Sequence, residues 1–387
     1  MKIAILHSGD LNGVSPGGVD RYVKSMIKGL GPDRVTVFGT TSASTGMRLG
    51  ESYENEHEGV SYHFVPVSYN SRTPLCVYYA LALPKFFKQL NRFDCIYSQR
   101  IEYTIPFFGS GLNRKVFQMI HGSSAYTEMG LGKMIARVYP FFEKWAIGIA
   151  RRTYIVLNRA EFGVPYYKQL YQKYSDKISY GRNPIDCAYY SGLSKKEARG
   201  RLSLGQGSIV VYSGRVVHNP KRVLLLPEIC KSLMLFDSSI RFIVIGDGDD
   251  LEDVKRTAQR LGVQDRFLFT GYISDSEVIK TYLCAADVSV NISYFEGTST
   301  SILESLACGT PVVSTDVGDI HECLDGVHNG IVIPNRDNSV VRDAVRAISD
   351  ILNNGIPMNE SFMEYDLPRV ANSFVNDILS IGDARCS

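Results

Sequence analysis

The chain has 387 residues, of which 44% are hydrophobic and 21% are charged, and its formal net charge is +2. This length is too great for one hydrophobic core, so we expect two domains of ordinary size. The composition is that of a globular protein, and the near-balanced charge argues against a strongly electrostatic nucleic-acid binder. The eight cysteines lie singly, without CxxC or a metal-like spacing, which is typical of reduced thiols in the cytosol.

The start of the chain predicts a nucleotide-binding type of α/β unit. A short apolar strand at 2–7 is followed by a glycine-rich turn at 8–18 (SGDLNGVSPGG) and a helix at 19–30. The glycines do not fall as GxGxxG, so this turn is not the dinucleotide fingerprint. A tight turn that needs glycine for its backbone is the alternative interpretation.

Strands and helices continue to alternate through the first half. We expect strands at 35–38, 62–65, 95–98 and 116–120, a helix at 76–90, and a polar, irregular excursion at 40–59. His121 stands at the carboxyl end of the strand at 116–120, and this is the edge where open α/β sheets bind ligands. A histidine in this place can also be a structural hydrogen-bonding group.

Residues 133–174 combine many apolar and aromatic side chains with lysines and arginines. A core-facing helix with a solvated basic face explains this composition. The alternative is a surface that rests on anionic lipid or receives a lipid-linked acceptor. We recognise no signal peptide after Met1 and no apolar run of membrane-spanning length, so we expect a cytoplasmic protein. The lipid interpretation adds peripheral contact with the inner face of the membrane.

The second half begins with a strand at 209–213 that ends in Gly214-Arg215, with Lys221 shortly after. Two cations on one strand-exit loop can neutralise a diphosphate, although such residues are also common as solvated surface charge. The strand at 242–245 is followed by GDGDD, which raises the alternative of a dinucleotide-binding dehydrogenase. The third glycine of that motif is missing, because Leu251 stands in its place.

The most informative stretch is 288–313 (VSVNISYFEGTSTSILESLACGTPVV). It predicts a buried strand, a loop of small hydroxylated residues and a helix that ends at Gly309. Free backbone N–H groups and the helix dipole make such a junction an anion site. Glu296 and Glu304 flank it, and carboxylates can accept hydrogen bonds from the sugar diols of a nucleotide sugar. A solvated Glu296 and a Glu304 that merely favours the helix dipole are the alternative.

The setting FEGTSTSILESLACGTPVV, with seven residues between its two glutamates, resembles the donor-site motif of family 4 retaining glycosyltransferases of the group 1 type. The similarity continues in order through Ser314, Val317, Gly318, Glu322, Asn329, Gly330 and Pro334. The resemblance implies the α/β fold called GT-B, with two Rossmann-like domains facing each other across a cleft. Residues 1–184, with a crossover helix at about 366–387, would form the acceptor-side domain, and residues 185–365 the donor domain.

The resemblance also assigns roles to residues. It makes His121, at the donor sugar, and Glu296, at the sugar hydroxyls, the catalytic candidates. The donor-binding candidates are Gly17 and Gly18 near the phosphates, Arg215 and Lys221 on the diphosphate, Tyr272 and Ile273 at the base, Thr298, Ser299 and Thr300 at the helix start, and Glu304 at the ribose. Two residues depart from the family pattern: Arg222, where glycine usually follows the lysine, and Asp249, where proline is more frequent.

We therefore expect a retaining transferase that moves a sugar from a nucleotide-sugar co-substrate to a glycan or lipid-linked acceptor. No cofactor and no metal are expected, because the cations and the helix N-terminus can carry the charge of the leaving diphosphate. No DxD-like cluster stands where a metal would be needed. The alternatives are a nucleotide-sugar hydrolase or epimerase, an NAD-dependent dehydrogenase, and a non-catalytic subunit that binds nucleotide sugar.

Overall fold

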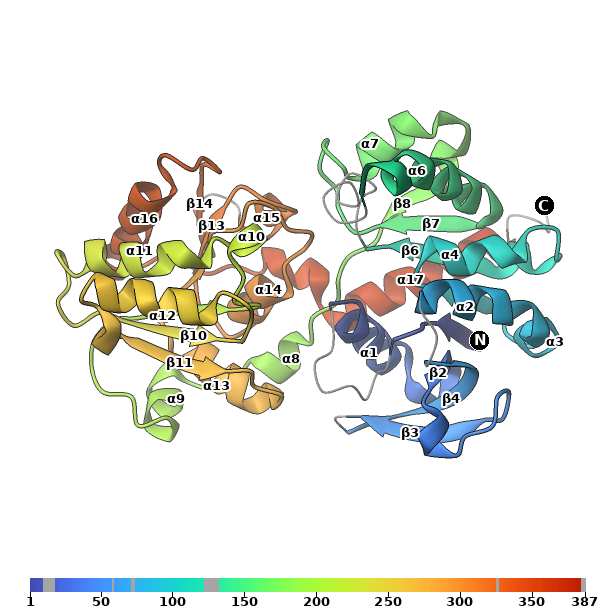
Figure 1. Cartoon of the computed structure of the whole chain (residues 1–387), viewed down its shortest axis with the longest axis horizontal. Helices are drawn as coiled ribbons and strands as arrows, with labels where there is room; N and C mark the ends of the chain where they lie inside the picture. The colour runs from blue at the N-terminus through green and yellow to red at the C-terminus, as the bar shows by residue number, and fades with distance from the viewer. Residues whose placement is uncertain (10–17, 58, 71–73, 122–131, 325–326, 384–387) are drawn as a thin grey trace. The chain divides into compact units, whose positions relative to one another are not determined.

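The structure is a computed structural model that describes residues 1–9, 18–57, 59–70, 74–121, 132–324 and 327–383. The chain divides into two compact units (Figure 1). Unit 1 consists of Met1–Pro184 and Leu367–Ser387, and unit 2 consists of Ile185–Asp366. Among the described residues, no helix combines the length and the apolar character needed to cross a membrane.

Unit 1 is built on an eight-stranded sheet in the order β3-β4-β2-β1-β5-β6-β7-β8. The strands are β1 Ile3–Leu6, β2 Val35–Thr41, β3 Tyr53–His57, β4 Val60–Tyr69, β5 Cys95–Ser98, β6 Val116–Ile120, β7 Arg152–Ile155 and β8 Ile178–Tyr180. In this spatial order, each strand from β4 to β8 pairs in parallel with the next one. Strand β3 pairs antiparallel with β4. Successive residues of β1 pack into two different apolar clusters, so the sheet is covered on both faces.

The prediction of an irregular segment at 40–59 is wrong in its last third. Residues 53–57 form the edge strand β3, which pairs with β4 through the turn at Gly59. The sequence YENEH is polar after its first residue, so it has no alternation of apolar and polar residues that would indicate a strand. Its pairing depends on the neighbouring strand rather than on its own side chains.

The helices of unit 1 are α1 Gly18–Leu30, α2 Leu75–Ala82, α3 Phe87–Leu90, α4 Ile101–Thr104, α6 Gly132–Ile149, α7 Val164–Leu170 and α17 Leu367–Asp383. The helix expected at 76–90 is interrupted by a 3-10 turn at Leu83–Phe86, where Pro84 lacks the N–H that an α-helix needs. The stretch 133–174 is not one helix, because β7 separates α6 from α7.

Unit 2 has a fully parallel six-stranded sheet in the order β11-β10-β9-β12-β13-β14. Its strands are β9 Ile209–Ser213, β10 Arg241–Ile245, β11 Phe267–Gly271, β12 Val288–Asn291, β13 Val312–Thr315 and β14 Gly330–Ile333. Its helices are α8 Cys187–Tyr190, α9 Lys195–Arg201, α10 His218–Lys221, α11 Leu226–Leu233, α12 Leu251–Arg260, α13 Ser276–Ala285, α14 Thr300–Ala307, α15 Ile320–Cys323 and α16 Val340–Asn354.

Each sheet contains a point at which the strand order reverses. In unit 2 the chain builds outward from β9 to β11, and then returns to place β12 on the other side of β9. In unit 1 the same reversal lies between β1 and β5. The loops that leave the two strands of a reversal diverge, and this opening is where parallel α/β sheets bind ligands. The fold therefore directs attention to the loops after β9 and β12, and to those after β1 and β5.

The last helix, α17, completes unit 1. Its residue Asp377 binds two side chains of β7: Arg152 Nη2 lies 2.9 Å from Asp377 Oδ1, and Tyr154 donates its hydroxyl to Oδ2 at 2.5 Å. Tyr154 is buried, and burial together with this carboxylate raises its pKa above the ordinary value. One carboxylate thus holds the final helix against the sheet through two charge-assisted hydrogen bonds.

We expect Asp377→Ala to lower the free energy of unfolding of unit 1 by about 2 kcal/mol, because it leaves a buried phenol without its acceptor and removes one of several acceptors of Arg152. Denaturant unfolding checks this value. Asn376→Ala, a change at an exposed position of the same helix, is the control and should leave the midpoint unchanged. Equal effects of the two substitutions would show that Asp377 does not anchor the helix.

Candidate functional site

At the strand-order reversal of unit 2, a lysine and a glutamate from different loops meet. Lys221 ends α10, in the loop after β9, and Glu296 lies in the loop after β12. Lys221 Nζ forms an ion pair with Glu296 Oε1, and the two side chains are only 17% and 14% exposed. Ser293 Oγ lies 2.8 Å from the same carboxylate oxygen. The carboxylate predicted beside an anion site is thus neutralised by one of the two predicted cations.

Arg222, one of the two departures from the family pattern, has a structural role that the sequence did not suggest. Its backbone is left-handed, with a φ of 52°, which explains why glycine suits this position. Its side chain is only 2% exposed and donates to Asn335 Oδ1 and Asp337 Oδ1, both at 2.7 Å. The guanidinium also lies 3.7 Å from the centre of the Tyr294 ring. Arg222 therefore links the loops after β9, β12 and β14, while Lys221 and Arg215 remain the candidate cations.

Arg215 is exposed, and its backbone oxygen accepts a hydrogen bond from Tyr212 at 2.7 Å. Its loop lies directly against the loop after β10. A Cβ atom on Gly246 would overlap the carbonyl oxygen of Gly214, and one on Gly248 would overlap that of Val216. The two glycines of GDGDD are thus explained by close backbone packing, which removes the main argument for a dehydrogenase.

The small hydroxylated residues of 298–301 stand at the start of α14, as predicted. Thr298 is buried and donates to Asp319 Oδ2 at 3.2 Å. Ser299 is the N-cap residue, yet its hydroxyl lies 3.1 Å from Ser301 Oγ instead of capping the helix, which begins at Thr300. Gly318 lies so close to Gly297 that a Cβ atom there would overlap the carbonyl oxygen of Gly297. The loop after β13 therefore supports the loop that carries Glu296.

Glu304 lies one turn into α14 and is 7% exposed. Its helix packs into an apolar cluster through Ile302, Leu303 and Leu306. Glu296, which the alternative interpretation makes a solvated residue, is also little exposed, at 14% of its side chain. The base-site candidates follow β11, where Tyr272 is 39% exposed and Ile273 packs against the apolar cluster under β9 and β10.

In unit 1, His121 extends from the carboxyl end of β6 and lies beside the end of β5. Its Nε2 is 2.8 Å from Gln99 Oε1, so this nitrogen carries the proton and donates it. The ring packs edge-on against Tyr22, with centroids 4.8 Å apart. Burial, with smaller contributions from His7 and Arg100, lowers the pKa of His121 to about 3. The imidazole is therefore neutral at physiological pH and serves as a hydrogen-bonding group.

His7, at the end of β1, is a residue that the sequence analysis missed. Its Nε2 lies 2.6 Å from Asp20 Oδ1 of α1, and the side chain is 5% exposed. Gln99 was also missed, and is 2% exposed. The signal that would have found both is position, since each directly follows a buried parallel strand at the strand-order reversal. Gly18 is exposed at the start of α1, and Gly17 lies outside the described residues.

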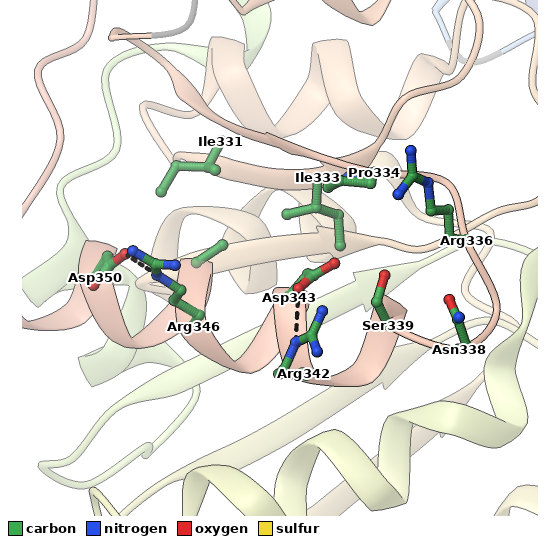
Figure 2. Close-up of a pocket in the computed structure, with 11 residues that line it drawn as sticks. Ile331, Ile333, Pro334, Arg336, Asn338, Ser339, Arg342, Asp343, Arg346 and Asp350 are labelled. Carbon is green, nitrogen blue, oxygen red and sulfur yellow. Dashed lines mark hydrogen bonds and ion pairs between the residues drawn. The ribbon is translucent and has the colours of Figure 1, made fainter.

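One hollow lies away from these residues, between β14 and α16 (Figure 2). It has a volume of about 630 Å³ and is open and polar. Two of its arginines lie next to acidic residues of the same helix, with Arg342 Nε 3.2 Å from Asp343 Oδ1 and Arg346 Nε 4.0 Å from Asp350 Oδ2. A much smaller hollow, of about 10 Å³, is lined by Glu296, Thr298 and Asp319 among others. We favour the smaller one as the functional site, because carboxylates from the loops after β12 and β13 line it and one of them, Glu296, pairs with Lys221 from the loop after β9.

Comparison with solved structures defines the class of the fold. Sucrose-phosphate synthase from Thermosynechococcus elongatus superposes with a TM-score of 0.74 at 19% identity, covering 99% of this chain and 100% of that chain. Anabaena Alr3699/HepE in complex with UDP-glucose gives a TM-score of 0.70 at 16% identity, over 98% of this chain and 100% of that one. Two parallel-sheet α/β units with these neighbours confirm the predicted GT-B fold.

Comparison of sequences identifies the second unit more closely. Residues 207–354, less than half of the chain, match the family model described as glycosyl transferases group 1. Alpha-monoglucosyldiacylglycerol synthase from Streptococcus pneumoniae is 34% identical over 119 residues. That match covers 31% of this chain and 27% of the relative, so it spans only about a quarter of the relative's length. All the candidates after β9 lie within residues 207–354, the segment that the family model matches.

Because folding lowers the pKa of His121, the unfolded chain binds a proton more readily between pH 6.5 and about 3. His121 therefore has no effect on the pH dependence of the free energy of unfolding above pH 6.5. As the pH falls below 6.5, protonation of this histidine in the unfolded chain lowers the free energy of unfolding by at most about 1.4 kcal/mol per pH unit. We expect His121→Gln to flatten this slope, as denaturant unfolding at a series of pH values would show. His63→Gln in β4 is the control for loss of a histidine from the same unit. An unchanged slope in His121→Gln would contradict the assignment of a neutral His121.

Proposed function

We propose that this chain is a glycosyltransferase that moves a sugar from a nucleoside-diphosphate sugar to a glycan or lipid-linked acceptor, with retention of configuration at the anomeric carbon. The observation that carries the proposal is the ion pair of Lys221 and Glu296 at the strand-order reversal of unit 2, within the segment that the family model matches. The cation can bind phosphate oxygens, and the carboxylate can accept hydrogen bonds from sugar hydroxyls. A neighbour of the same fold is bound to UDP-glucose, which supports a donor of this chemical class.

In this proposal the donor diphosphate binds at Arg215, Lys221 and the N-terminus of α14. The exposed guanidinium of Arg215 is available for a bidentate contact, and Lys221 acts as a point charge. Glu296 binds hydroxyls of the transferred sugar, and Glu304 binds the ribose. Tyr272 and Ile273 contact the base, and unit 1 binds the acceptor, with Gly17 and Gly18 near the donor phosphates.

The reaction breaks the bond between the anomeric carbon and the diphosphate oxygen, and forms a bond from the acceptor oxygen to the same face of that carbon. The acceptor proton passes to the leaving phosphate, so no separate general base is needed. Negative charge grows on the leaving diphosphate, and Arg215, Lys221 and the helix N-terminus stabilise it without reorganising. We therefore propose a reaction that needs no bound metal. Neutral His121 gives its one N–H to Gln99, so its Nδ1 is left to accept a hydrogen bond from a sugar hydroxyl.

We expect the double variant Arg215→Ala with Lys221→Ala to weaken binding of the nucleoside diphosphate by a factor of a hundred or more, because two charge-assisted contacts are lost, each worth about 1.5–3 kcal/mol. Calorimetric titration with uridine, guanosine, adenosine and cytidine diphosphates measures this loss. The matched control removes two exposed cations of unit 2, with Lys231→Ala and Arg260→Ala. Binding that survives in the first variant would exclude these residues as the diphosphate site.

We expect the two glutamates to differ in kinetics. Glu296→Gln should lower kcat by roughly a hundredfold, because it removes the negative charge and one of the two acceptor oxygens at the reacting sugar. Glu304→Gln should raise KM for the donor by roughly tenfold or more, because the ribose hydrogen bonds weaken. Steady-state rates, with product anomers assigned by NMR, test both. Wild-type kinetics in both variants, or release of free sugar without transfer, would contradict the proposal.

A further inference from the structure

Helix α6 of unit 1 exposes a continuous apolar face. Its residues Val138, Phe141, Phe142 and Trp145 are 47%, 69%, 42% and 37% exposed. Their spacing of three, four and seven positions places them on one side of a helix, and we call them the α6 stripe. Phe108 extends the stripe, because it is 67% exposed and its ring packs edge-on against Trp145 with centroids 5.5 Å apart. Apolar side chains gathered in this way differ from the single exposed hydrophobic residues of an ordinary surface.

Helix α6 buries Ala146 and Ile147 in an apolar cluster, as expected for a helix packed on a sheet, but it also buries a charged residue. The acidic residue of the helix, Glu143, is completely buried. Tyr171 donates to one of its carboxylate oxygens at 2.7 Å, and Tyr167 donates to the other at 3.0 Å. The tyrosines that the sequence offered as part of a lipid-contacting surface therefore point inward. Burying a carboxylate while leaving two phenylalanines in solvent costs stability, so the outward face needs a reason other than folding.

The charge that remains on the outward face is of one sign. Arg137 and Lys144 are exposed beside the stripe. Glu143, which would oppose them, is held inside by the two tyrosines. An exposed face with aromatic side chains and basic residues matches the chemistry of an anionic lipid surface, where rings enter the interface and cations meet headgroup phosphates. A second copy of this chain would bring the same positive charges together.

We propose that the α6 stripe, with Phe108, Arg137 and Lys144, docks this protein on an anionic lipid bilayer. The occupant is the membrane surface itself, and the helix lies in the interface. The inference stands apart from the proposed sugar transfer, because binding to vesicles is measured without donor or acceptor. The membrane contact that the sequence analysis assigned to residues 133–174 is thereby assigned to one face of helix α6.

The sequence offers a direct probe, because the chain contains a single tryptophan and that residue is Trp145 of the stripe. We expect its fluorescence to shift to the blue when the full chain is mixed with vesicles of phosphatidylglycerol and phosphatidylcholine. Vesicles of phosphatidylcholine alone should produce little shift. Added salt should weaken the response, because it screens Arg137 and Lys144. No shift with anionic vesicles, or an equal shift with neutral vesicles, overturns the proposal.

Two variants test which residues act. Phe141→Ser with Phe142→Ser should weaken vesicle binding about tenfold or more, because two large apolar groups no longer enter the interface. Arg137→Gln with Lys144→Gln should weaken binding to anionic vesicles by a similar factor. The matched control is Leu235→Ser with Phe236→Ser, which removes an exposed apolar pair of unit 2, 84% and 72% exposed, and should bind as the wild type does.

Co-sedimentation with the vesicles gives the affinities, and circular dichroism verifies that each variant is folded. Undiminished binding by folded variants of both kinds would exclude the stripe. A blue shift that depends on protein concentration without vesicles would overturn the proposal in favour of a contact between copies.

Discussion

The candidate site depends on one electrostatic constraint: a carboxylate can stand beside an anion site only if a cation neutralises it. The ion pair of Lys221 and Glu296 meets this condition. The sheet order makes the pair possible, because β9 and β12 are neighbours although 74 residues separate Ser213 from Val288. The loops after these strands are then kept in register by backbone packing, between Gly246 and Gly214 on one side and between Gly318 and Gly297 on the other. The strand order therefore brings the loops of the candidate site together, and the side chains of those loops then form the ion pair.

The sequence predicted those elements of the fold and of the candidate site that are determined by residues close together in the chain. The strand at 209–213 is apolar up to its last residue, Ser213. The strand, loop and helix of 288–313 are marked by β-branched residues, small hydroxylated residues and helix stop signals. The GT-B fold followed from that stretch through its family resemblance, and the structure confirms it. The roles assigned to the single residues stay predictions.

The parts that the sequence did not predict depend on distant partners. Arginine is ordinarily a surface residue, so nothing local indicates that Arg222 is buried between Asn335, Asp337 and Tyr294. Edge strand β3 lacks an alternating pattern, and the inward direction of Tyr167 and Tyr171 depends on a carboxylate more than 20 residues away in the chain. His7 and Gln99 become notable only when the strand order is known.

The place of α17 in unit 1 has a consequence for how the protein is made. Residues 185–366 form unit 2 and are translated before α17, whose Asp377 binds Arg152 and Tyr154 of β7. At ordinary rates of synthesis this leaves the sheet of unit 1 without its last helix for on the order of ten to forty seconds. The apolar surface that Phe374 and Ile378 later cover stays open meanwhile. Unit 2 can thus finish folding before α17, the final segment of unit 1, has been synthesised. This order is the reverse of the usual one, in which the N-terminal domain folds first.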